Sequence, residues 1–333
     1  MLLVSSQRPT RQPTRLNYLR RRTVAGAAAA GVLVALVGAV RGDPPSRLEA
    51  QAVSLSSAQQ AQLPWRAVVT DGAAGVLDGR GLPSATAQSA ALERYRAIGL
   101  PIYCAGGRGH YAALTFDDGP SSYSPQVLDM LRRAGAEATF FVIGGQIPGA
   151  TGIVRRQARA GTVGDHTWDH VNLTRMSAGD VASELDRTRR AIERTAHQPV
   201  TLVRAPYGAR DAVLDARIRQ LGFVHVLWDV DTRDSVGAGT TGIVQNAESG
   251  LAPGAIVLMH ETSDRSLAAL PQVLVAARRK HLRLVTAPQL LALDPPPDAL
   301  VRAGGVGCED REHYRREEDA GGMRLSANGG ATR

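Results

Sequence analysis

Short apolar runs alternate with longer amphipathic stretches between about residues 109 and 293 of this 333-residue chain. The runs are rich in β-branched residues and bounded by turn residues, which is typical of buried β-strands. They predict strands at Tyr111–Phe116, Ala138–Ile143, Thr201–Val203, Val224–Trp228, Ala255–Met259 and Arg283–Val285. The stretches between them predict helices at Pro125–Ala134, Ile153–Ala160, Ala178–Thr195, Ala212–Leu221 and Leu267–Lys280. This alternation predicts an α/β fold with a mainly parallel sheet or barrel, whose functional groups lie at the carboxyl ends of the strands.

The flanking segments differ in composition from this central region. An arginine-rich and then apolar start is followed by a Ser-, Gln-, Ala- and Pro-rich stretch, and the far end is rich in proline, glycine and charge. One further helix is expected at Ala85–Ile98, because the pattern ends before Gly99 and Pro101. We therefore divide the chain into a signal peptide or N-terminal anchor (1–40), a linker (41–63), an N-terminal extension (64–108), a catalytic domain (109–295) and a C-terminal tail (296–333), disordered after Cys308.

The positive charge of the chain is concentrated at its start. Residues 1–40 hold six arginines and no acidic residue, so the formal net charge of +8 falls to 8 − 6 = +2 without them. The remainder is nearly balanced, and the charge therefore does not indicate a nucleic-acid partner. The apolar run Thr23–Val40 after the arginines is typical of a cleaved secretory signal, with an uncleaved anchor as the alternative. Both alternatives predict a secreted or cell-surface protein that meets the membrane only through this segment.

The two cysteines fit an extracytoplasmic setting. Cys104 precedes the central region and Cys308 follows it. An even number of cysteines in a secreted chain favours pairing, so a disulfide between them is expected, with two unpaired thiols as the alternative.

Polar residues follow the ends of several predicted strands. Asp117 and Asp118 follow the first strand, before a Gly-Pro turn that can bend both carboxylates into one pocket. Neighbouring carboxylates suit metal chemistry, because one can bind the ion while the other takes a proton. An ordinary acidic turn is the alternative explanation of this motif.

Two histidines stand four residues apart, at His166 and His170. In a helical turn they would share one face, a spacing that suits two imidazoles on one metal ion. Asp165 and Asp169 are candidates for orienting them. Two histidines and Asp118 form a ligand set that zinc accepts, as do cobalt and ferrous iron.

Three further residues complete the candidate chemistry. Arg204 ends the strand Thr201–Val203 and can hold Asp117 with its guanidinium, with a surface salt bridge as the alternative. His260 ends the strand Ala255–Met259. An aspartate such as Asp234 beside it would raise its pKa and make it a general acid.

With these motifs in place, the region from about Tyr111 to Leu293 resembles the NodB-like polysaccharide deacetylases, the fourth carbohydrate esterase family. The resemblance rests on the segments Phe116-Asp117-Asp118-Gly119-Pro120, His166-Thr167-Trp168-Asp169-His170, Arg204-Ala205-Pro206-Tyr207, Asp231-Thr232-Arg233-Asp234 and Leu258-Met259-His260. It implies a distorted, incomplete (β/α) barrel and a metal-dependent hydrolase acting on carbon–nitrogen bonds other than peptide bonds. The implied substrate is an N-acetylglucosamine polymer such as peptidoglycan or chitin oligomers, from which acetate is released.

The resemblance also implies a role for each motif residue. Asp118, His166 and His170 would bind the divalent metal, most simply zinc. Asp117 would be the general base tethered by Arg204, and His260 the general acid supported by Asp234. The backbone N–H of Tyr207 would stabilise an oxyanion, and Leu258 would line the pocket for the acetyl methyl group.

Two departures from the family pattern bear on function. Ser235 follows Asp234 where relatives usually carry tryptophan, which removes an apolar wall from the pocket. Asp165 stands where relatives often carry asparagine. Two alternatives remain open: an O-acetyl esterase acting on acetylated xylan, since relatives with almost the same residues have that activity, and a carbohydrate-binding relative with impaired catalysis, which Ser235 slightly favours.

Overall fold

The computed structural model describes residue 78 and residues 80–311. The predicted signal or anchor, the predicted linker and nearly all of residues 64–79 lie outside the described residues, as does the end of the tail from residue 312. The prediction of disorder after Cys308 therefore also concerns mostly residues outside the description.

One sheet of eight parallel strands forms the centre of the described region. The strands are β1 (Tyr111–Gly119), β2 (Ala138–Val142), β3 (Gly161–Asp165), β4 (Leu202–Val203), β5 (Val224–His225), β6 (Val230–Asp231), β7 (Ile256–His260) and β8 (Arg283–Val285). Their order is β5-β4-β3-β2-β1-β7-β6, with β8 paired to β1. Because the strands are parallel, their carboxyl ends meet at one rim, and the register places Asp117 of β1 opposite His260 of β7.

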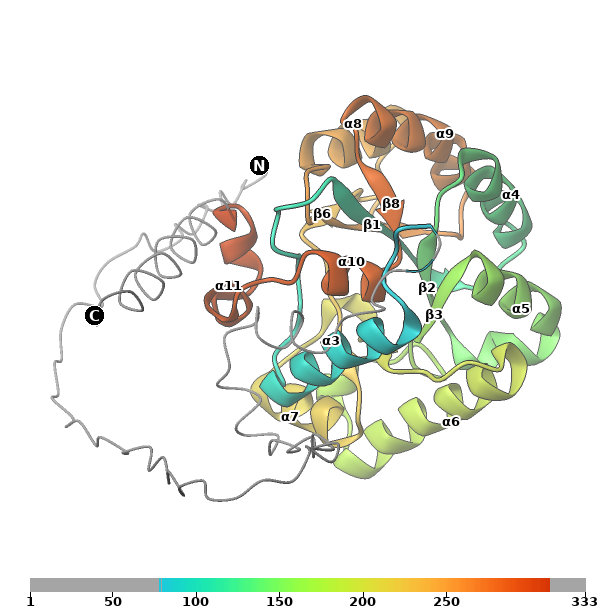
Figure 1. Ribbon diagram of the computed structural model, residues 1–333. Helices are drawn as coiled ribbons and strands as arrows, with labels where there is room; N and C mark the ends of the chain where they lie inside the picture. The colour runs from blue at the N-terminus through green and yellow to red at the C-terminus, as the bar shows by residue number, and fades with distance from the viewer. Residues whose placement is uncertain (1–77, 79, 312–333) are drawn as a thin grey trace, which may run out of the picture. The chain divides into compact units, whose positions relative to one another are not determined.

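Helices flank this sheet in the described region. They are α3 (Ala85–Ile98), α4 (Ser124–Ala134), α5 (Thr151–Ala160), α6 (Ala178–Ala196), α7 (Ala212–Gln220), α8 (Thr240–Gly250), α9 (Asp264–Arg279), α10 (Ala287–Leu293) and α11 (Asp298–Ala303). Neighbouring helices pack in the order α8, α9, α4, α5, α6 around the sheet (Figure 1). None of the helices in the described part of the chain has both the length and the apolar character that crossing a bilayer requires.

The sheet curls without closing. Ile102 forms a parallel bridge with Val226, just beyond the end of β5, and Ala105 donates to the carbonyl of Gly254 just before β7. The segment 102–105 therefore lies between the edge strand β5 and the start of β7, and β5 does not pair with the other edge strand, β6, in the described region. This arrangement confirms the predicted distorted, incomplete (β/α) barrel.

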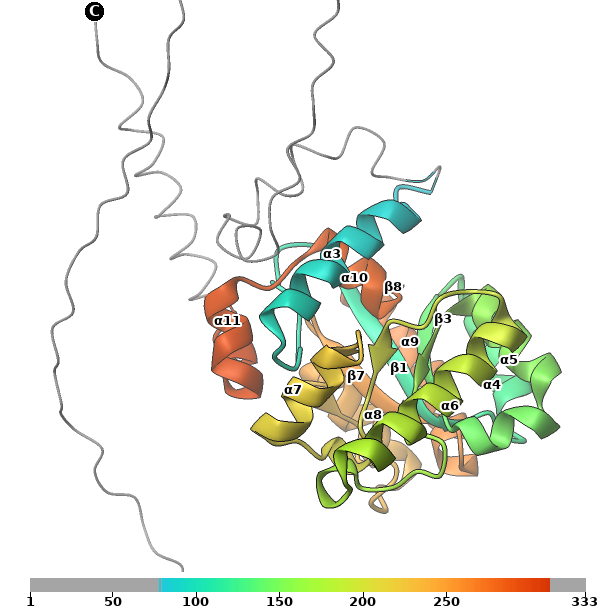
Figure 2. The same ribbon diagram turned by 90° about the horizontal axis from the view of Figure 1, so that it is seen from below.

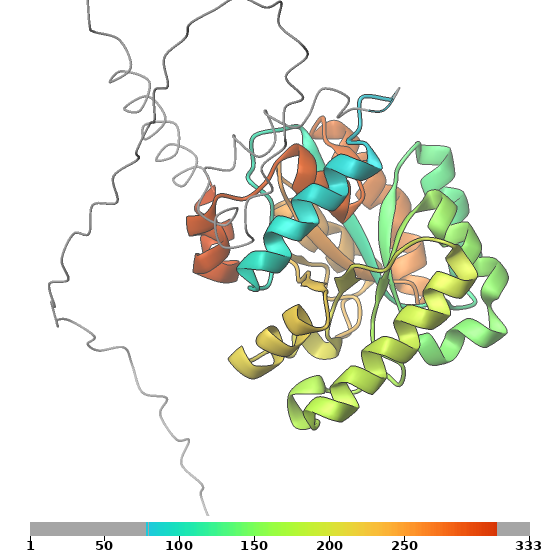
Figure 3. The same cartoon turned by 60° about the horizontal axis from the view of Figure 1, so that its bottom comes forward.

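The concave side of the sheet has an apolar floor and a polar rim. Side chains alternate along a strand, so Ala113 and Asp117 of β1 lie on the same face. Ala113 belongs to a buried cluster that includes Phe141 and Ile256 together with residues of α3 and α10. Figures 2 and 3 show α3 lying against α10 at this end, with α11 nearby. The two helices thus close the floor, and the polar groups are left at the opposite rim.

Several elements were not predicted from the sequence. β3 and β6 are absent from the predicted strands, and α8, α10 and α11 from the predicted helices. The segment from residue 296 is not simply a tail, because α11 and the 3-10 helix Gly304–Cys308 fold against the domain. An ion pair between Arg94 of α3 and Asp298 of α11 ties this segment to the N-terminal extension.

Candidate active site

The end of β1 places two carboxylates in the same pocket. In a regular strand Asp117 and Asp118 would point to opposite faces. Asp118 has a φ of 66°, which breaks this alternation at the rim. As a result, Oδ2 of Asp117 and Oδ1 of Asp118 lie 3.8 and 3.4 Å from Nε2 of His166. The next residue is Gly119, where a Cβ would come within 1.6 Å of a Glu261 carboxyl oxygen, so any other residue would require the Glu261 side chain to move.

The two histidines converge on Asp118 from a loop and not from a helical turn, so that prediction was wrong. His166 follows β3, and the chain to His170 has no regular structure, with a left-handed φ at Thr167 and at His170. These two turns of the backbone bring Nε2 of His170 to 3.1 Å from Oδ1 of Asp118.

His166 is oriented by a backbone carbonyl and not by Asp165, which corrects a second prediction. Its Nδ1 lies 2.7 Å from the carbonyl oxygen of Arg204, which can only accept, so Nδ1 carries a proton and the neutral imidazole would present the lone pair of Nε2 to Asp118. Asp165 instead accepts a hydrogen bond from the backbone N–H of Thr167. Burial raises the pKa of Asp165 well above its ordinary value. No contact with either imidazole is seen for the carboxylate of Asp169 among the described residues.

These three side chains fit a divalent metal ion. The ligand atoms of Asp118, His166 and His170 all lie within 4.8 Å of one another. Oδ1 of Asp118 is buried and forms no hydrogen bond with any described residue, although it faces the lone pair of His166. An ionised carboxylate oxygen and an imidazole lone pair that face each other without a shared proton are what a cation would bridge.

Arg204 holds Asp117 in the interior of the protein. Its side chain is fully buried, and Nη1 donates to Oδ1 of Asp117 and to Oγ1 of Thr115, both at 2.8 Å. Nε and Nη2 donate to the backbone carbonyls of Val226 and Leu227 at 3.0 and 2.9 Å. The surface salt bridge considered as an alternative is therefore excluded. Burial lowers the pKa of Arg204, and Asp117 opposes this effect.

His260 lies on the other side of the pocket, paired with Asp234. Its Nδ1 is 2.7 Å from Oδ1 of Asp234, and its backbone N–H donates to Oδ2 at 2.8 Å. Burial would lower the pKa of His260, but the hydrogen bond to Asp234 and the charges of Asp117, Asp234 and Asp118 together raise it to about 9. The imidazole is therefore protonated at neutral pH.

Tyr207 and Leu258 lie at the margins of this pocket. Tyr207 is 70% exposed with a φ of 64°, and its ring edge contacts the imidazole of His170 at a centroid distance of 4.8 Å. Leu258 is buried two residues before His260 on β7, so both side chains leave the same face of that strand. The roles of the Tyr207 N–H and of Leu258 stay predictions.

Ser235 follows the aspartate that pairs with His260. It is exposed, and its backbone N–H donates to Oδ1 of Asp234 at 2.9 Å. Trp228 packs against Gly208, where a Cβ would approach the indole within 2.8 Å, and it lies over the Arg204 guanidinium at 5.5 Å. Trp228 therefore supports the Arg204 side of the site.

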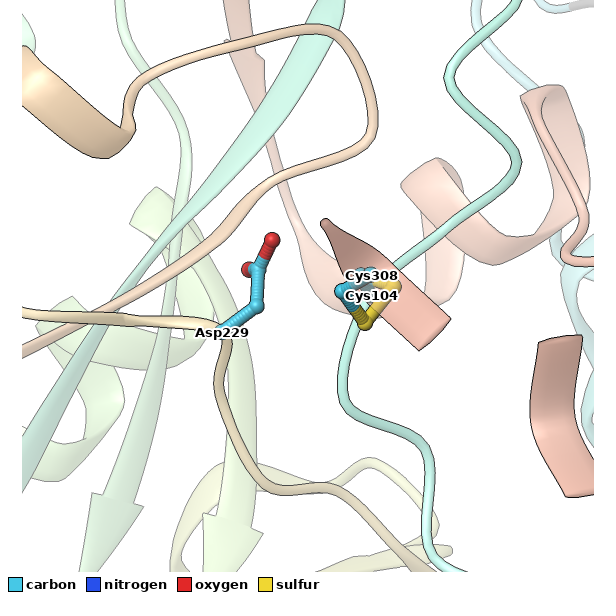
Figure 4. A group of neighbouring side chains, drawn as sticks. All are labelled: Cys104, Asp229 and Cys308. Carbon is cyan, nitrogen blue, oxygen red and sulfur yellow. A yellow bond between two sulfur atoms is a disulfide. The ribbon is translucent and has the colours of Figure 1, made fainter. Parts of the chain in front are cut away.

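The predicted disulfide between Cys104 and Cys308 is present. Asp229 lies beside it, and its carboxylate and the two sulfur atoms form a second group with ligand spacing (Figure 4). The sulfur atoms are bonded to each other, and both oxygens of Asp229 accept hydrogen bonds, from the Ile256 N–H and from Arg311. The atoms of this group are therefore already bonded to other partners, and Asp118, His166 and His170 are the candidate metal ligands.

Supporting residues were missed from the sequence. Thr115 accepts a hydrogen bond from the same Nη1 of Arg204 that donates to Asp117. Ser266 of α9 donates to Oδ2 of Asp234 at 2.7 Å. Glu261 is buried beside the turn at Gly119 and accepts from Gln157 at 2.6 Å, and burial raises its pKa to about 8. Thr115 and Glu261 adjoin recognised motifs, which was the one available signal, whereas nothing in the sequence links Ser266 to Asp234.

A metal-binding carboxylate-and-histidine cluster at the rim of an open (β/α) barrel defines a class of metal-dependent hydrolases. Comparison with known proteins supports this class. Residues 106–226 match the family model for polysaccharide deacetylases. The chain is 34% identical over 194 residues to a chitooligosaccharide deacetylase of Bradyrhizobium, covering 53% of this chain and 89% of that protein. The chain belongs to the polysaccharide deacetylase family.

Two further similarities concern peptidoglycan deacetylases. A peptidoglycan-N-acetylglucosamine deacetylase of Listeria monocytogenes is 36% identical over 181 residues, covering 54% of this chain. The matched region spans only 38% of that relative. The crystal structure of the Bc1960 peptidoglycan N-acetylglucosamine deacetylase has a TM-score of 0.55 and 29% identity, covering 57% of this chain and 92% of that one.

Proposed function

We propose that this protein is a metal-dependent deacetylase that removes N-acetyl groups from an N-acetylglucosamine-containing polysaccharide, such as peptidoglycan or chitin oligomers, and releases acetate. The observation that carries the proposal is a candidate metal-ligand cluster beside a carboxylate tethered by Arg204, with a carboxylate-paired imidazole on the neighbouring strand. The names of the relatives support the choice of substrate class.

Asp118, His166 and His170 are the proposed metal ligands. A bound divalent ion would supply Lewis acidity that activates water and the acetyl carbonyl. Zinc fits two imidazoles and a carboxylate well, and cobalt and ferrous iron accept the same set.

Asp117 is the proposed general base. Oδ1 is held by Arg204, which leaves Oδ2 facing the cluster to take the proton from the attacking water. The buried guanidinium fixes the orientation of the carboxylate. Arg204 therefore acts by orienting the base and not by touching substrate.

His260 is the proposed general acid. Its imidazolium gives a proton to the sugar nitrogen as the carbon–nitrogen bond of the tetrahedral intermediate breaks, leaving acetate and a free amine. Asp234 is fully committed to His260, Ser235 and Ser266, so the imidazole has one orientation. The N–H of Tyr207 would stabilise the oxyanion, and Leu258 would contact the acetyl methyl group.

Replacing Asp234 by asparagine is expected to shift the alkaline limb of the pH–activity profile to lower pH. His260 must be protonated to act, so wild-type activity should fall as the pH rises through about 9. Without the carboxylate the imidazole loses its main stabilising partner, and the limb should move down by about 1–3 units. Asp129→Asn, at a surface position of α4 away from the strand rim, is the control. If the alkaline limb of the pH–activity profile did not move in Asp234→Asn, Asp234 would not be what raises the pKa of His260.

Acetate release by the purified chain tests the proposed function. N-acetylchitooligosaccharides, peptidoglycan fragments and acetylated xylan are offered side by side, with zinc or cobalt added or with a chelator. Metal-dependent release from an N-acetylated substrate supports the proposal and identifies the preferred polymer. Release from xylan alone would establish the O-acetyl esterase instead. Bound metal without release from any substrate would favour the carbohydrate-binding relative, with Ser235 as the first residue to exchange for tryptophan.

We also propose that the protein works outside the cytoplasm, secreted or held at the cell surface. The arginine-rich start and apolar run of residues 1–40 support this proposal, as does the disulfide, since disulfides persist in oxidising compartments.

A further inference from the structure

Two of the four acceptors that hold Arg204 are backbone carbonyls. They belong to Val226 and Leu227, in the irregular segment 226–229 that connects β5 with β6. A carbonyl can hold a guanidinium only as firmly as its own backbone is fixed. The placement of Asp117 by Arg204 therefore depends on what fixes residues 226–229.

The N-terminal extension and the start of β7 fix this segment from two sides. Leu227 donates to the carbonyl of Ile102 at 2.7 Å, and Ile102 donates in turn to His225. At the other end, Oδ1 of Asp229 accepts from the Ile256 N–H at 2.7 Å. Both neighbours lie outside the metal-binding motifs.

The C-terminal segment is bonded to residues next to both of these contacts, near Ile102 and at Asp229. Cys308 is bonded to Cys104, two residues after Ile102. Arg311 lies three residues beyond Cys308, and its Nη1 donates to Oδ2 of Asp229 at 2.6 Å, in a pair whose side chains are 14% and 7% exposed. Figure 4 shows Asp229 on the segment beside the disulfide. Residues 308–311 thus clasp the segment 226–229 to the strand-like residues 102–105.

We propose that Arg311 and Asp229 are positioning residues for the proposed deacetylation: their buried ion pair fixes the segment 226–229, whose carbonyls hold Arg204 against the general base Asp117. The inference rests on the proposed function. Neither residue touches the metal-ligand cluster, and neither belongs to a motif that carries the family resemblance.

Removing Arg311 would leave a buried carboxylate with too few partners. The Ile256 N–H would be the remaining donor seen for Asp229, and an uncompensated buried charge is strongly unfavourable. Burial already raises the pKa of Asp229 to about 6, with Arg311 opposing that rise. The carboxylate would be relieved of this cost by taking up a proton or by moving towards solvent, and in both cases the ion pair that fixes the carbonyls of Val226 and Leu227 is lost.

The test is the hydrogen-exchange rate of the Arg204 Nε–H, followed by NMR in the metal-loaded full chain. This proton is buried and bonded to the Val226 carbonyl, so its exchange reports opening of the segment. In Arg311→Ala we expect exchange to be faster by about tenfold, and kcat to fall with KM little changed. Arg302→Ala is the matched control, because Arg302 is an exposed arginine of the same C-terminal segment. Equal exchange rates in the two folded variants would overturn the proposal.

A second variant separates positioning from general damage. Asp229→Asn in the Arg311→Ala background leaves no buried charge and keeps an acceptor for Ile256, so exchange should return towards the wild-type rate. No recovery would contradict the mechanism. Should Arg311→Ala not fold, Arg311→Lys is compared with Arg302→Lys, and unchanged exchange overturns the proposal equally. If the wild type releases no acetate, the proposed function fails, whereas the exchange rates still decide whether the clasp holds Arg204.

Discussion

Replacing Asp117 by asparagine is expected to lower acetate release by about 10²–10⁴-fold while the bound metal remains. Asparagine has nearly the same shape and can still accept from Arg204, but it cannot take a proton from water. The metal ligands are Asp118, His166 and His170, so the metal content should be unchanged. Acetate release and metal stoichiometry measured on the same sample check both statements.

Asp129→Asn provides the control for this variant. Asp129 is a surface residue of α4 that pairs with Arg156 on α5, away from the strand rim. A surface pair of this kind contributes little, so activity should stay near that of the wild type. Unchanged hydrolysis by Asp117→Asn would show that another group is the base.

Replacing His170 by alanine is expected to abolish activity through loss of the metal. His170 is the better choice of the two histidines, because it is partly exposed whereas His166 is buried and donates to the Arg204 carbonyl. Losing one of three protein ligands should weaken metal binding by more than about 100-fold, the upper range for losing a mere supporting contact. Metal affinity is measured by titration with a competing chelator.

His110→Ala is the matched control, since this histidine is exposed and lies before β1. It should bind metal and release acetate as the wild type does. Full metal affinity in His170→Ala would contradict the assignment of the ligand set.

The barrel and its rim could be predicted because the chemistry follows regular strands. Asp117 and Asp118 end β1, and His260 ends β7, the neighbour of β1. In a parallel sheet every strand delivers its carboxyl end to the same rim, so residues 143 positions apart in the chain were correctly expected to meet.

β3 was not predicted because its two glycines interrupt the apolar pattern that is typical of a buried strand. Its sequence is Gly161-Thr162-Val163-Gly164-Asp165, and glycine is depleted in strands. The neighbouring strand β2 leaves no room for a side chain at either glycine. A Cβ at Gly161 would come within 1.9 Å of the Ala138 carbonyl, and one at Gly164 within 2.7 Å of the Phe141 ring. Close approach of the neighbouring strand is a tertiary property that no local pattern reveals.

The loop that carries His166 and His170 and the contact between Arg311 and Asp229 also could not be predicted from local sequence patterns. A spacing of four residues suits a helical turn, yet left-handed residues in a loop bring His166 and His170 to the same carboxylate. The pair Arg311–Asp229 joins residues 82 positions apart, in a segment predicted to be a tail. Contacts between residues so far apart in the sequence depend on the tertiary fold, and the composition of a segment does not predict them.

The most direct measurement of the central claim is acetate release from N-acetylchitooligosaccharides during titration of the chelator-treated protein with zinc. The account predicts no release without metal, a linear rise with added zinc and a plateau at one ion per chain, with no response in His170→Ala. Equal release before and after chelation, or the same titration curve in His170→Ala, would contradict a metal-dependent deacetylase centred on Asp118, His166 and His170.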